Sequence, residues 1–223
     1  MTIGFRIAVA AARADDGLLD RFAEVPTAHA SDCMHRMFAG GAALRPMHGG
    51  GKLVGSALTV RVRPGDNLMV HKAIDIARPR DVIVVDAGGD LTQAIVGELM
   101  MRHAQKRLVA GFVIHGAVRD SATIRSDSFP VYALGVTHRG PYKDGPGEIN
   151  APVAIGGMVV SPGDVIVGDE DGVVAVPLAQ AEQVLALAAK HREREDRVMR
   201  DILAGTVDRS WVDAALEARG LGR

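Results

Sequence analysis

Apolar residues follow two different periods along this chain, and each period predicts one kind of element. Residues 81–86 and 108–114 are nearly continuous runs of apolar, mostly β-branched residues, typical of strands buried on both faces. Residues 52–63 alternate between apolar and polar, as expected of a further strand. Short stretches with helical spacing lie between these strands, and this alternation predicts an α/β core.

The predicted helices of the first half differ in length. Residues 14–45 are interpreted as helical, with Asp16 as the N-cap. Residues 69–77 predict a short helix that ends before Pro79. A third helix is expected over 97–106, and a start as early as Thr92 is an alternative.

The last third of the chain has a different pattern. Residues 151–176 are short valine-rich runs separated by Pro-Gly-Asp and Asp-Gly turns, which favour antiparallel strands. Residues 178–204 predict a long helix whose apolar stripe ends near Ala188, where the almost wholly charged stretch 190–197 begins. We therefore expect one domain over residues 1–223, with 178–223 as a helical C-terminal extension.

Composition and charge narrow the classes of partner. The 26 Lys and Arg residues against 27 Asp and Glu leave a net charge of -1, so neither a nucleic-acid nor an anionic membrane partner is expected. Cys33 is the one cysteine, which fits a reducing compartment. The apolar run at 7–12 is far shorter than the roughly 20 residues of a membrane helix. These observations predict a cytoplasmic protein.

Arg119 and Asp120 are the first candidates for chemistry, because they come directly after a predicted buried strand. Ligands of open α/β sheets bind at the carboxyl ends of strands. A carboxylate there suits a hard divalent cation, and an adjacent guanidinium suits a carboxylate or a developing oxyanion. An ordinary ion pair in a loop is the alternative interpretation.

Two further segments contain candidate groups. Gly97-Glu98-Leu99-Met100 opens a predicted helix, whose first amides can bind an anion, although an ordinary helix start has the same pattern. Glu193 and Glu195 lie in the charged stretch, which is equally consistent with a solvated face. The eight histidines contain no HxH or HExxH pair, so a histidine zinc site is not expected.

Taken together, these motifs resemble the RraA-like family, which includes the 4-hydroxy-4-methyl-2-oxoglutarate aldolases. The resemblance rests on residues 97–100, on Gly116-Ala117-Val118-Arg119-Asp120 with Arg119 22 positions after Gly97, and on the run from Pro162 to Val173. Pro26-Thr27 followed by Ser31-Asp32 resembles the family's opening. The likeness spans roughly Pro26 to Gly205.

The resemblance implies a fold and a set of site residues. The fold would be a swivelling α/β/α-type sandwich with an antiparallel β segment and a C-terminal helical arm, assembled as a homotrimer or hexamer. Asp120 would bind Mg²⁺ or Mn²⁺ directly. Glu98, and Glu195 from a neighbouring subunit, would contact it through water, with Glu193 as the rival of Glu195. Arg119 and the backbone of Gly97 to Met100, comprising Gly97, Glu98, Leu99 and Met100, would bind the substrate.

The function that the resemblance implies is a class II pyruvate aldolase. Arg119 and Glu98 would be the catalytic residues, the substrate a small 2-keto acid such as 4-hydroxy-4-methyl-2-oxoglutarate, and oxaloacetate decarboxylation a side activity. His115 stands where many relatives have Asp, a departure that leaves the Arg-Asp pair intact. The alternative is a non-catalytic RraA-like regulator that binds an RNA-degradation enzyme.

Overall fold

The computed structural model describes residues 3–9 and 12–221. Ala10 and Ala11 of the short apolar run, and both ends of the expected 1–223 domain, therefore lie outside the described residues. No helix within the described ranges combines the length and the apolar character needed to cross a membrane.

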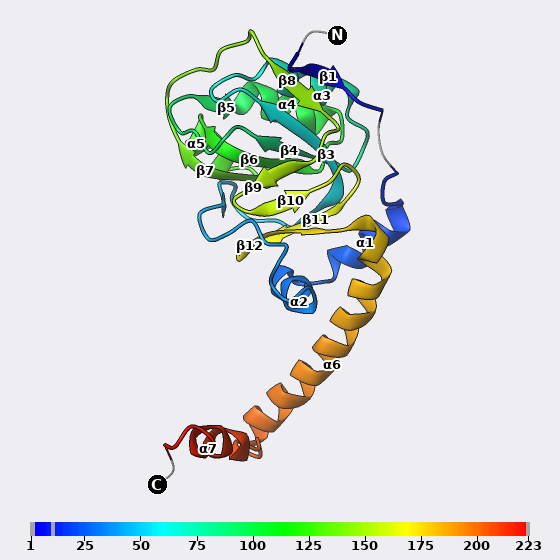
Figure 1. The fold of residues 1–223 in the computed structure, drawn as a ribbon, viewed down its shortest axis with the longest axis vertical. Coiled ribbons are helices and arrows are strands. Elements are labelled where there is room, and N and C mark those ends of the chain that lie inside the picture. The colour runs from blue at the N-terminus through cyan, green and yellow to red at the C-terminus, as the bar shows by residue number, and fades with distance from the viewer. Residues whose placement is uncertain (1–2, 10–11, 222–223) are drawn as a thin grey trace.

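A mostly parallel sheet forms the centre of the molecule (Figure 1). Its four parallel strands lie in the order β3 (Leu53–Val62), β4 (Asp81–Asp86), β6 (Gly111–Val118) and β7 (Val131–Val136). Shorter strands extend it: β1 (Phe5–Ile7), β2 (Arg45–Pro46), β5 (Ala94–Val96) and β8 (Gly147–Ile149). The parallel order places the carboxyl ends of β4, β6 and β7 at one edge, where the candidate site lies.

Antiparallel strands make up the segment that the valine-rich runs predict. The strands β11 (Val165–Asp169) and β12 (Gly172–Val176) form a hairpin that joins the main sheet through β3. The strands β9 (Val153–Ile155) and β10 (Met158–Val160) form a separate two-stranded sheet. The predicted combination of a parallel core, antiparallel pairs and a long C-terminal helix is confirmed.

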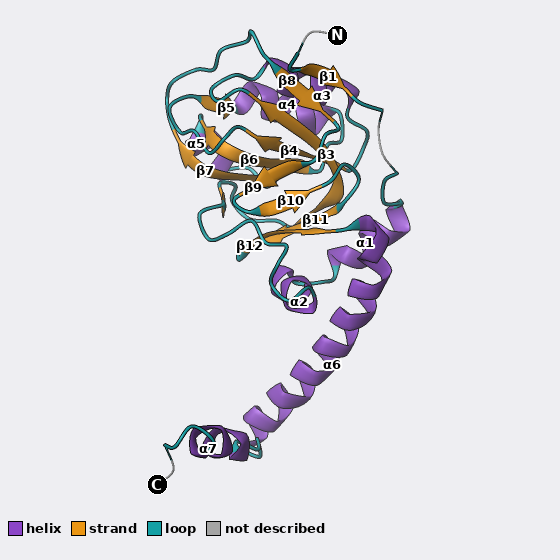
Figure 2. Ribbon diagram, in the orientation of Figure 1, coloured by secondary structure: helices purple, strands orange, loops and turns teal. Residues whose placement is uncertain are grey.

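Helices cover the main sheet unevenly (Figure 2). The helices α3 (Leu68–Ile76) and α4 (Glu98–Lys106) pack on one face, where Val70, Ile74 and Met101 are buried against the strands. The short α5 (Ser121–Arg125) adds Ile124 to the same core. The opposite face of the sheet is covered by β9 and β10, which enclose Tyr132.

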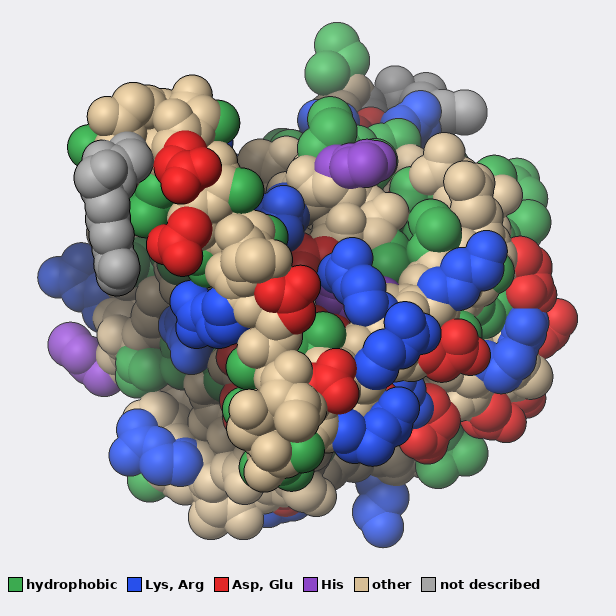
Figure 3. Space-filling model, turned by 90° about the horizontal axis from the view of Figure 1, so that it is seen from below, with side chains coloured by type: hydrophobic (Ala, Val, Ile, Leu, Met, Phe, Trp, Pro, Cys, Tyr) green, Lys and Arg blue, Asp and Glu red, His purple; other side chains and the backbone are tan. Residues whose placement is uncertain are grey.

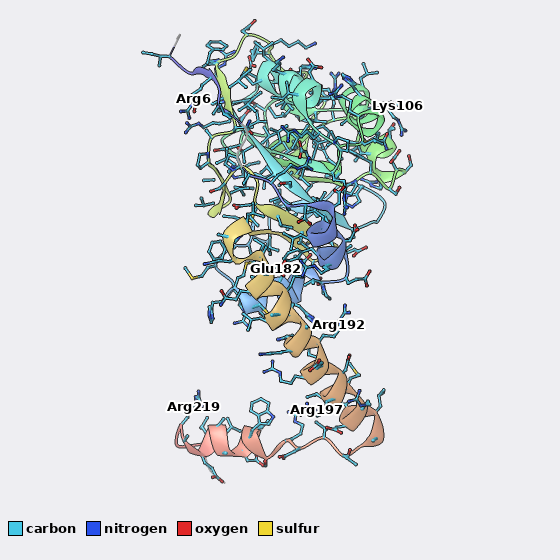
Figure 4. The ribbon with its side chains drawn as sticks, turned by 90° about the vertical axis from the view of Figure 1, so that its right-hand side faces the viewer. Arg6, Lys106, Glu182, Arg192, Arg197 and Arg219 are labelled. Carbon is cyan, nitrogen blue, oxygen red and sulfur yellow. The ribbon has the colours of Figure 1, made fainter. Side chains whose placement is uncertain are left out.

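A further hydrophobic cluster connects the C-terminal helices, which we call the arm, to the rest of the molecule, which we call the body. In it α1 (Asp16–Ala23), α2 (Thr27–Cys33) and the start of α6 (Ala181–Ala204) pack against β11 and β12. A 3₁₀ turn, η1 (Leu178–Gln180), precedes α6, and α7 (Ser210–Glu217) follows it. The buried residues of α6 all lie in its first eight, and the rest of the helix extends away from the body (Figures 1 and 4).

Several predicted boundaries are wrong, each for a local reason. The expected helix over 14–45 is two short helices separated at Pro26, and its N-cap is Asp15, whose side chain accepts from the Leu18 amide, and not Asp16. The alternative helix start at Thr92 is wrong because Ala94–Val96 pairs with β6 as β5. The strand predicted at 108–114 begins at Gly111, because Leu108 has a positive φ of 60°.

Candidate functional site

Asp120 is held at the carboxyl end of β6 by backbone geometry. Its φ of 56° and ψ of 37° are left-handed, a conformation that turns the chain sharply into α5. Its Oδ2 accepts a hydrogen bond of 2.9 Å from the backbone N–H of Glu98, at the start of α4. Two motifs that are 22 residues apart in sequence are therefore joined, as the resemblance implies.

Gly97 is the residue that permits this close approach. A Cβ added at Gly97 would lie 2.5 Å from Asp120 Oδ2 and 2.9 Å from Arg119 Cγ, both closer than van der Waals contact. The requirement is for space, because the φ of Gly97 is −142°, which any residue adopts. Arg119 also lies close to the carboxylate, with its Nε 3.7 Å from Asp120 Oδ2.

A cavity of about 240 Å³ opens beside these groups. Gly97, Leu99, Met100 and Arg119 line it. The Glu98 amide donates to Asp120, and the Met101 amide donates to Gly97 O. The amides of Leu99 and Met100 have no acceptor among the described residues, so the first turn of α4 presents free N–H groups next to the cavity.

Three lining residues belong to the site although the sequence patterns did not single them out. Asn67 is buried and its Nδ2 donates to Ile95 O, but its Oδ1 has no hydrogen-bond donor within the described part of the chain. His71 and Lys143 line the same cavity. Burial lowers the pKa of His71, and the nearby Lys143 lowers it further, so the imidazole is neutral at neutral pH.

The two acidic residues predicted near the cavity, Glu98 and Asp120, make different contacts. The carboxylate of Glu98 lies 3.7 Å from Arg102 Nε, one helical turn along α4, and is 43% exposed. Asp120 is 41% exposed, and its Oδ1 makes no hydrogen bond to the described residues. His115 Nδ1 lies 3.4 Å from Asp86 Oδ1 on the neighbouring strand, so this histidine contacts a carboxylate at the same sheet edge.

Glu195 is not brought to Asp120 within one chain. It lies on α6, whereas Asp120 precedes α5 at the far side of the sheet (Figure 1). Its Oε1 is 2.9 Å from His191 Nε2 and its Oε2 is 2.7 Å from His29 Nε2. These hydrogen bonds, that of His191 first, lower the pKa of Glu195. Glu193 makes no ion pair or side-chain hydrogen bond to the described residues.

Two histidines meet in the fold although they are far apart in the sequence. Spacing along the chain contains no zinc-type pair, yet His29 and His191 meet with ring centroids 4.7 Å apart. They come from α2 and α6, so no local motif could reveal them.

The molecular surface agrees with the balanced charge. Figure 3 shows basic and acidic side chains interspersed over the face that is seen from below. That face therefore presents no broad basic surface of the kind that binds nucleic acid.

Comparisons with known proteins agree with the geometry. A Halalkalibacterium halodurans protein, provisionally named a 4-hydroxy-4-methyl-2-oxoglutarate aldolase, is 39% identical over 192 residues, 85% of this chain and 91% of that protein. An uncharacterised protein of Pseudomonas syringae has a similar structure, with a TM-score of 0.79 and 25% identity over 89% of this chain and 93% of that one.

Another similar solved structure is named after a ribonuclease inhibitor and not after an aldolase. RraAS2 of Streptomyces coelicolor, described as an unusual member of the RNase ES inhibitor RraA family, has a TM-score of 0.74 and 27% identity over 82% of this chain and 96% of that one. The model of the RraA-like family, described as Aldolase/RraA, matches residues 27–175, which include the strands around the cavity and the Arg119-Asp120 pair. The chain belongs to the RraA-like family, whose members bear the names of both aldolases and RraA regulators.

Proposed function

We propose that this protein is a divalent-metal-dependent lyase that cleaves 4-hydroxy-4-methyl-2-oxoglutarate, or a related 4-hydroxy-2-oxo diacid, to pyruvate and a second keto acid. One observation carries the proposal. Arg119, Leu99 and Met100 line one cavity, and the adjacent Asp120 has a carboxylate oxygen that makes no hydrogen bond to the described residues. These groups are the ones needed to bind a 2-keto acid and to stabilise its enolate.

The residues fit a hard divalent cation. Asp120 offers an exposed oxygen donor of the kind that Mg²⁺ and Mn²⁺ prefer, and a single direct carboxylate ligand suits a cation that keeps several waters. Glu98, and Glu195 of a neighbouring subunit, would hold it through water. When bound, the cation supplies Lewis acidity to the keto oxygen.

Cleavage then follows from the positions of the protein groups. The Leu99 and Met100 amides bind the carboxylate next to the keto group. The C3–C4 bond breaks as the C4 hydroxyl gives its proton to the water that Glu98 orients, and the electron pair moves onto the C2 oxygen as an enolate. Arg119 stabilises that oxygen, and proton return to C3, from water oriented by Glu98, gives the methyl group of pyruvate.

The second carboxylate of a diacid also has a counterpart in the cavity. Lys143 lines the cavity with Arg119, so two cations face a substrate that carries two negative charges. Asn67 Oδ1, which has no hydrogen-bond donor among the described residues, is available to accept a hydrogen bond from the substrate hydroxyl. Oxaloacetate decarboxylation is the proposed side activity, since it passes through the same enolate.

The assembly that we propose is a homotrimer or a hexamer, with each site completed by the arm of a neighbouring subunit. The arm supports this because it extends from the body with apolar side chains exposed, among them Met199 and Leu203. In one chain Glu195 lies on α6, which extends away from the sheet, whereas Asp120 lies at the start of α5 beside the sheet (Figure 1).

A pyruvate-release assay tests the proposed function. The protein is stripped with EDTA and supplied with 4-hydroxy-4-methyl-2-oxoglutarate, with and without Mg²⁺ or Mn²⁺. We expect metal-restored turnover in the parent, loss of turnover in Asp120→Asn, and a fall in kcat of about 10²–10³-fold in Arg119→Ala. Asp171→Asn, at the tip of the β11–β12 hairpin, is the matched control and should retain the parent rate.

The second candidate function is the non-catalytic regulator, which the similarity to the Streptomyces RraA-family protein favours. It predicts no turnover of either keto acid by the folded, metal-loaded protein, and capture of an RNA-degradation enzyme without any metal. Turnover in EDTA equal to that with metal would contradict the metal-dependent proposal instead.

A further inference from the structure

Two histidines and one glutamate converge at the point where α6 leaves the body. Their ligand atoms, one from each of His29, His191 and Glu195, all lie within 4.8 Å of one another. Both imidazoles are largely enclosed, at 15% exposure, while the carboxylate is 53% exposed. In Figure 4 the neighbouring Arg192 marks this part of α6, just beyond the packed helices.

The fold orients these side chains toward one another. His191 and Glu195 are four residues apart on α6 and so share one face of that helix. His29 comes from α2, which packs against the same part of α6 in one hydrophobic cluster. His29 Nδ1 is buried, so the ring presents its Nε2 to the group.

The donor set matches one class of metal ion. Two imidazole nitrogens and one carboxylate oxygen are the three protein ligands of many open zinc sites, in which water takes the fourth position. With bonds of about 2.0–2.1 Å, tetrahedral ligands lie about 3.3–3.4 Å apart. His29 Nε2 lies 2.7 Å from Glu195 Oε2, and His191 Nε2 lies 2.9 Å from the other carboxylate oxygen, Oε1. With one ligand atom from each residue within 4.8 Å of the others, side-chain rotations would bring the group to tetrahedral spacing.

We propose that His29, His191 and Glu195 form a second metal site, specific for a borderline transition metal of the zinc class. It differs in chemistry from the Asp120 site, because imidazole nitrogen favours zinc, cobalt and nickel over magnesium. A metal bound here joins α2 to α6 and fixes the direction of the arm. It shares Glu195 with the proposed lyase site, so a metal held here would keep that carboxylate away from a neighbouring subunit.

Cobalt is the probe of choice, because tetrahedral Co²⁺ has strong visible absorption whereas octahedral Co²⁺ at an oxygen site is pale. The full chain is stripped of metal, placed in excess Mg²⁺ to saturate any oxygen-ligand site, and titrated with Co²⁺ and then with Zn²⁺. We expect one equivalent of strongly absorbing Co²⁺ that Zn²⁺ displaces, together with a rise in Tm.

Substitution of the histidines tests whether they are the residues that bind the metal. His191→Ala, beyond the buried residues of α6, should weaken Co²⁺ binding by at least about tenfold while circular dichroism stays that of the parent. His29→Ala should do the same, and His191→Ala keeps the test valid if His29→Ala fails to fold. Asp120→Asn and His103→Ala, an exposed histidine of α4, are the matched controls and should bind Co²⁺ like the parent.

Two results would overturn the proposal. One is the absence of a strongly absorbing Co²⁺ species in excess Mg²⁺, which would leave the three side chains as a hydrogen-bonded group only. The other is parent-like Co²⁺ binding by His191→Ala. Neither result measures pyruvate release, so failure of this proposal and failure of the lyase proposal can be told apart.

Discussion

At the scale of single residues, the candidate site depends on the absence of a side chain at Gly97. Gly97 has no Cβ, and this lets the Asp120 carboxylate and the Arg119 side chain lie against the start of α4. The sequence alone showed a glycine before a helix, an ordinary pattern, and only the family resemblance connected it with Arg119 and Asp120. Asn67 and Lys143 had no sequence signal, because their roles depend on a cavity formed by distant segments.

Gly97→Ala tests this dependence on space. The new methyl group would displace the Asp120 carboxylate, so we expect kcat to fall at least about tenfold and stability to fall by about 1–3 kcal/mol, as in overpacked sites. Gly17→Ala, where the nearest atom is 3.5 Å away, is the control and should retain the parent rate. Unchanged kcat and denaturation midpoint in Gly97→Ala would show that the approach is not needed.

His71 gives the cavity a pH dependence. Burial keeps its pKa below the ordinary value of about 6.5, so the unfolded chain takes up a proton at a higher pH than the folded protein does. The free energy of unfolding should therefore fall as pH is lowered through about 6.5. Lys143 and His103, which lower the pKa, and Asp75, which raises it, are the charged neighbours of His71.

Urea denaturation at about pH 7.5 and about pH 5.5 measures this effect. His71→Gln should lose less stability between the two values than the parent does. The exposed His138→Gln serves as the control and should behave like the parent. An equal loss in all three proteins would exclude His71 as the cause.

At the scale of elements, prediction from sequence succeeded where burial is uniform and failed where the environment changes along a segment. The continuous apolar run at 81–86 is β4 because both of its faces are covered. The expected helix over 14–45 is interrupted at Pro26 and again after Cys33, where the chain must return to β2. The three-residue strands β1 and β8 were missed because pairing partners, and not their own short patterns, define them.

The first part of helix α6 is buried and the rest is exposed. The same substitution made once in each part can therefore compare the two environments. Val184 is 3% exposed and belongs to the cluster with α1 and α2, whereas Val198 on the same helix is 44% exposed. Both Val→Ala changes raise helix propensity equally. We expect Val184→Ala to cost about 1–3 kcal/mol and Val198→Ala less than about 0.5 kcal/mol in urea denaturation. Equal costs would contradict the packing of α6 against the body.

At the scale of the whole molecule, the arm is the feature that a single chain does not explain. The far part of α6 and α7 exposes several large apolar side chains: Val198, Met199, Ile202, Leu203 and Trp211. Exposed apolar groups amid polar ones mark surfaces that bind another protein, here a second copy in the proposed assembly. The distance between Glu195 and Asp120 in one chain gives that assembly a direct test.

Mixing two inactive variants measures whether a site combines residues of two subunits. Asp120→Asn and Glu195→Gln should each be inactive alone, and equal amounts refolded together should recover about a quarter of the parent rate, the fraction of sites with both native residues. No recovery would mean that both residues act within one chain. If Glu195→Gln is active alone, the same experiment with Glu193→Gln tests the rival acid.

The Glu195 carboxylate also has a consequence for communication between sites. It is held by two imidazoles of its own chain, so serving a neighbour's site requires it to leave them. Filling one cavity would then alter the junction of α2 and α6 in an adjacent subunit. Such an exchange of partners would couple the free energies of substrate binding in neighbouring subunits. The dependence of rate on substrate concentration would then have a Hill coefficient different from one.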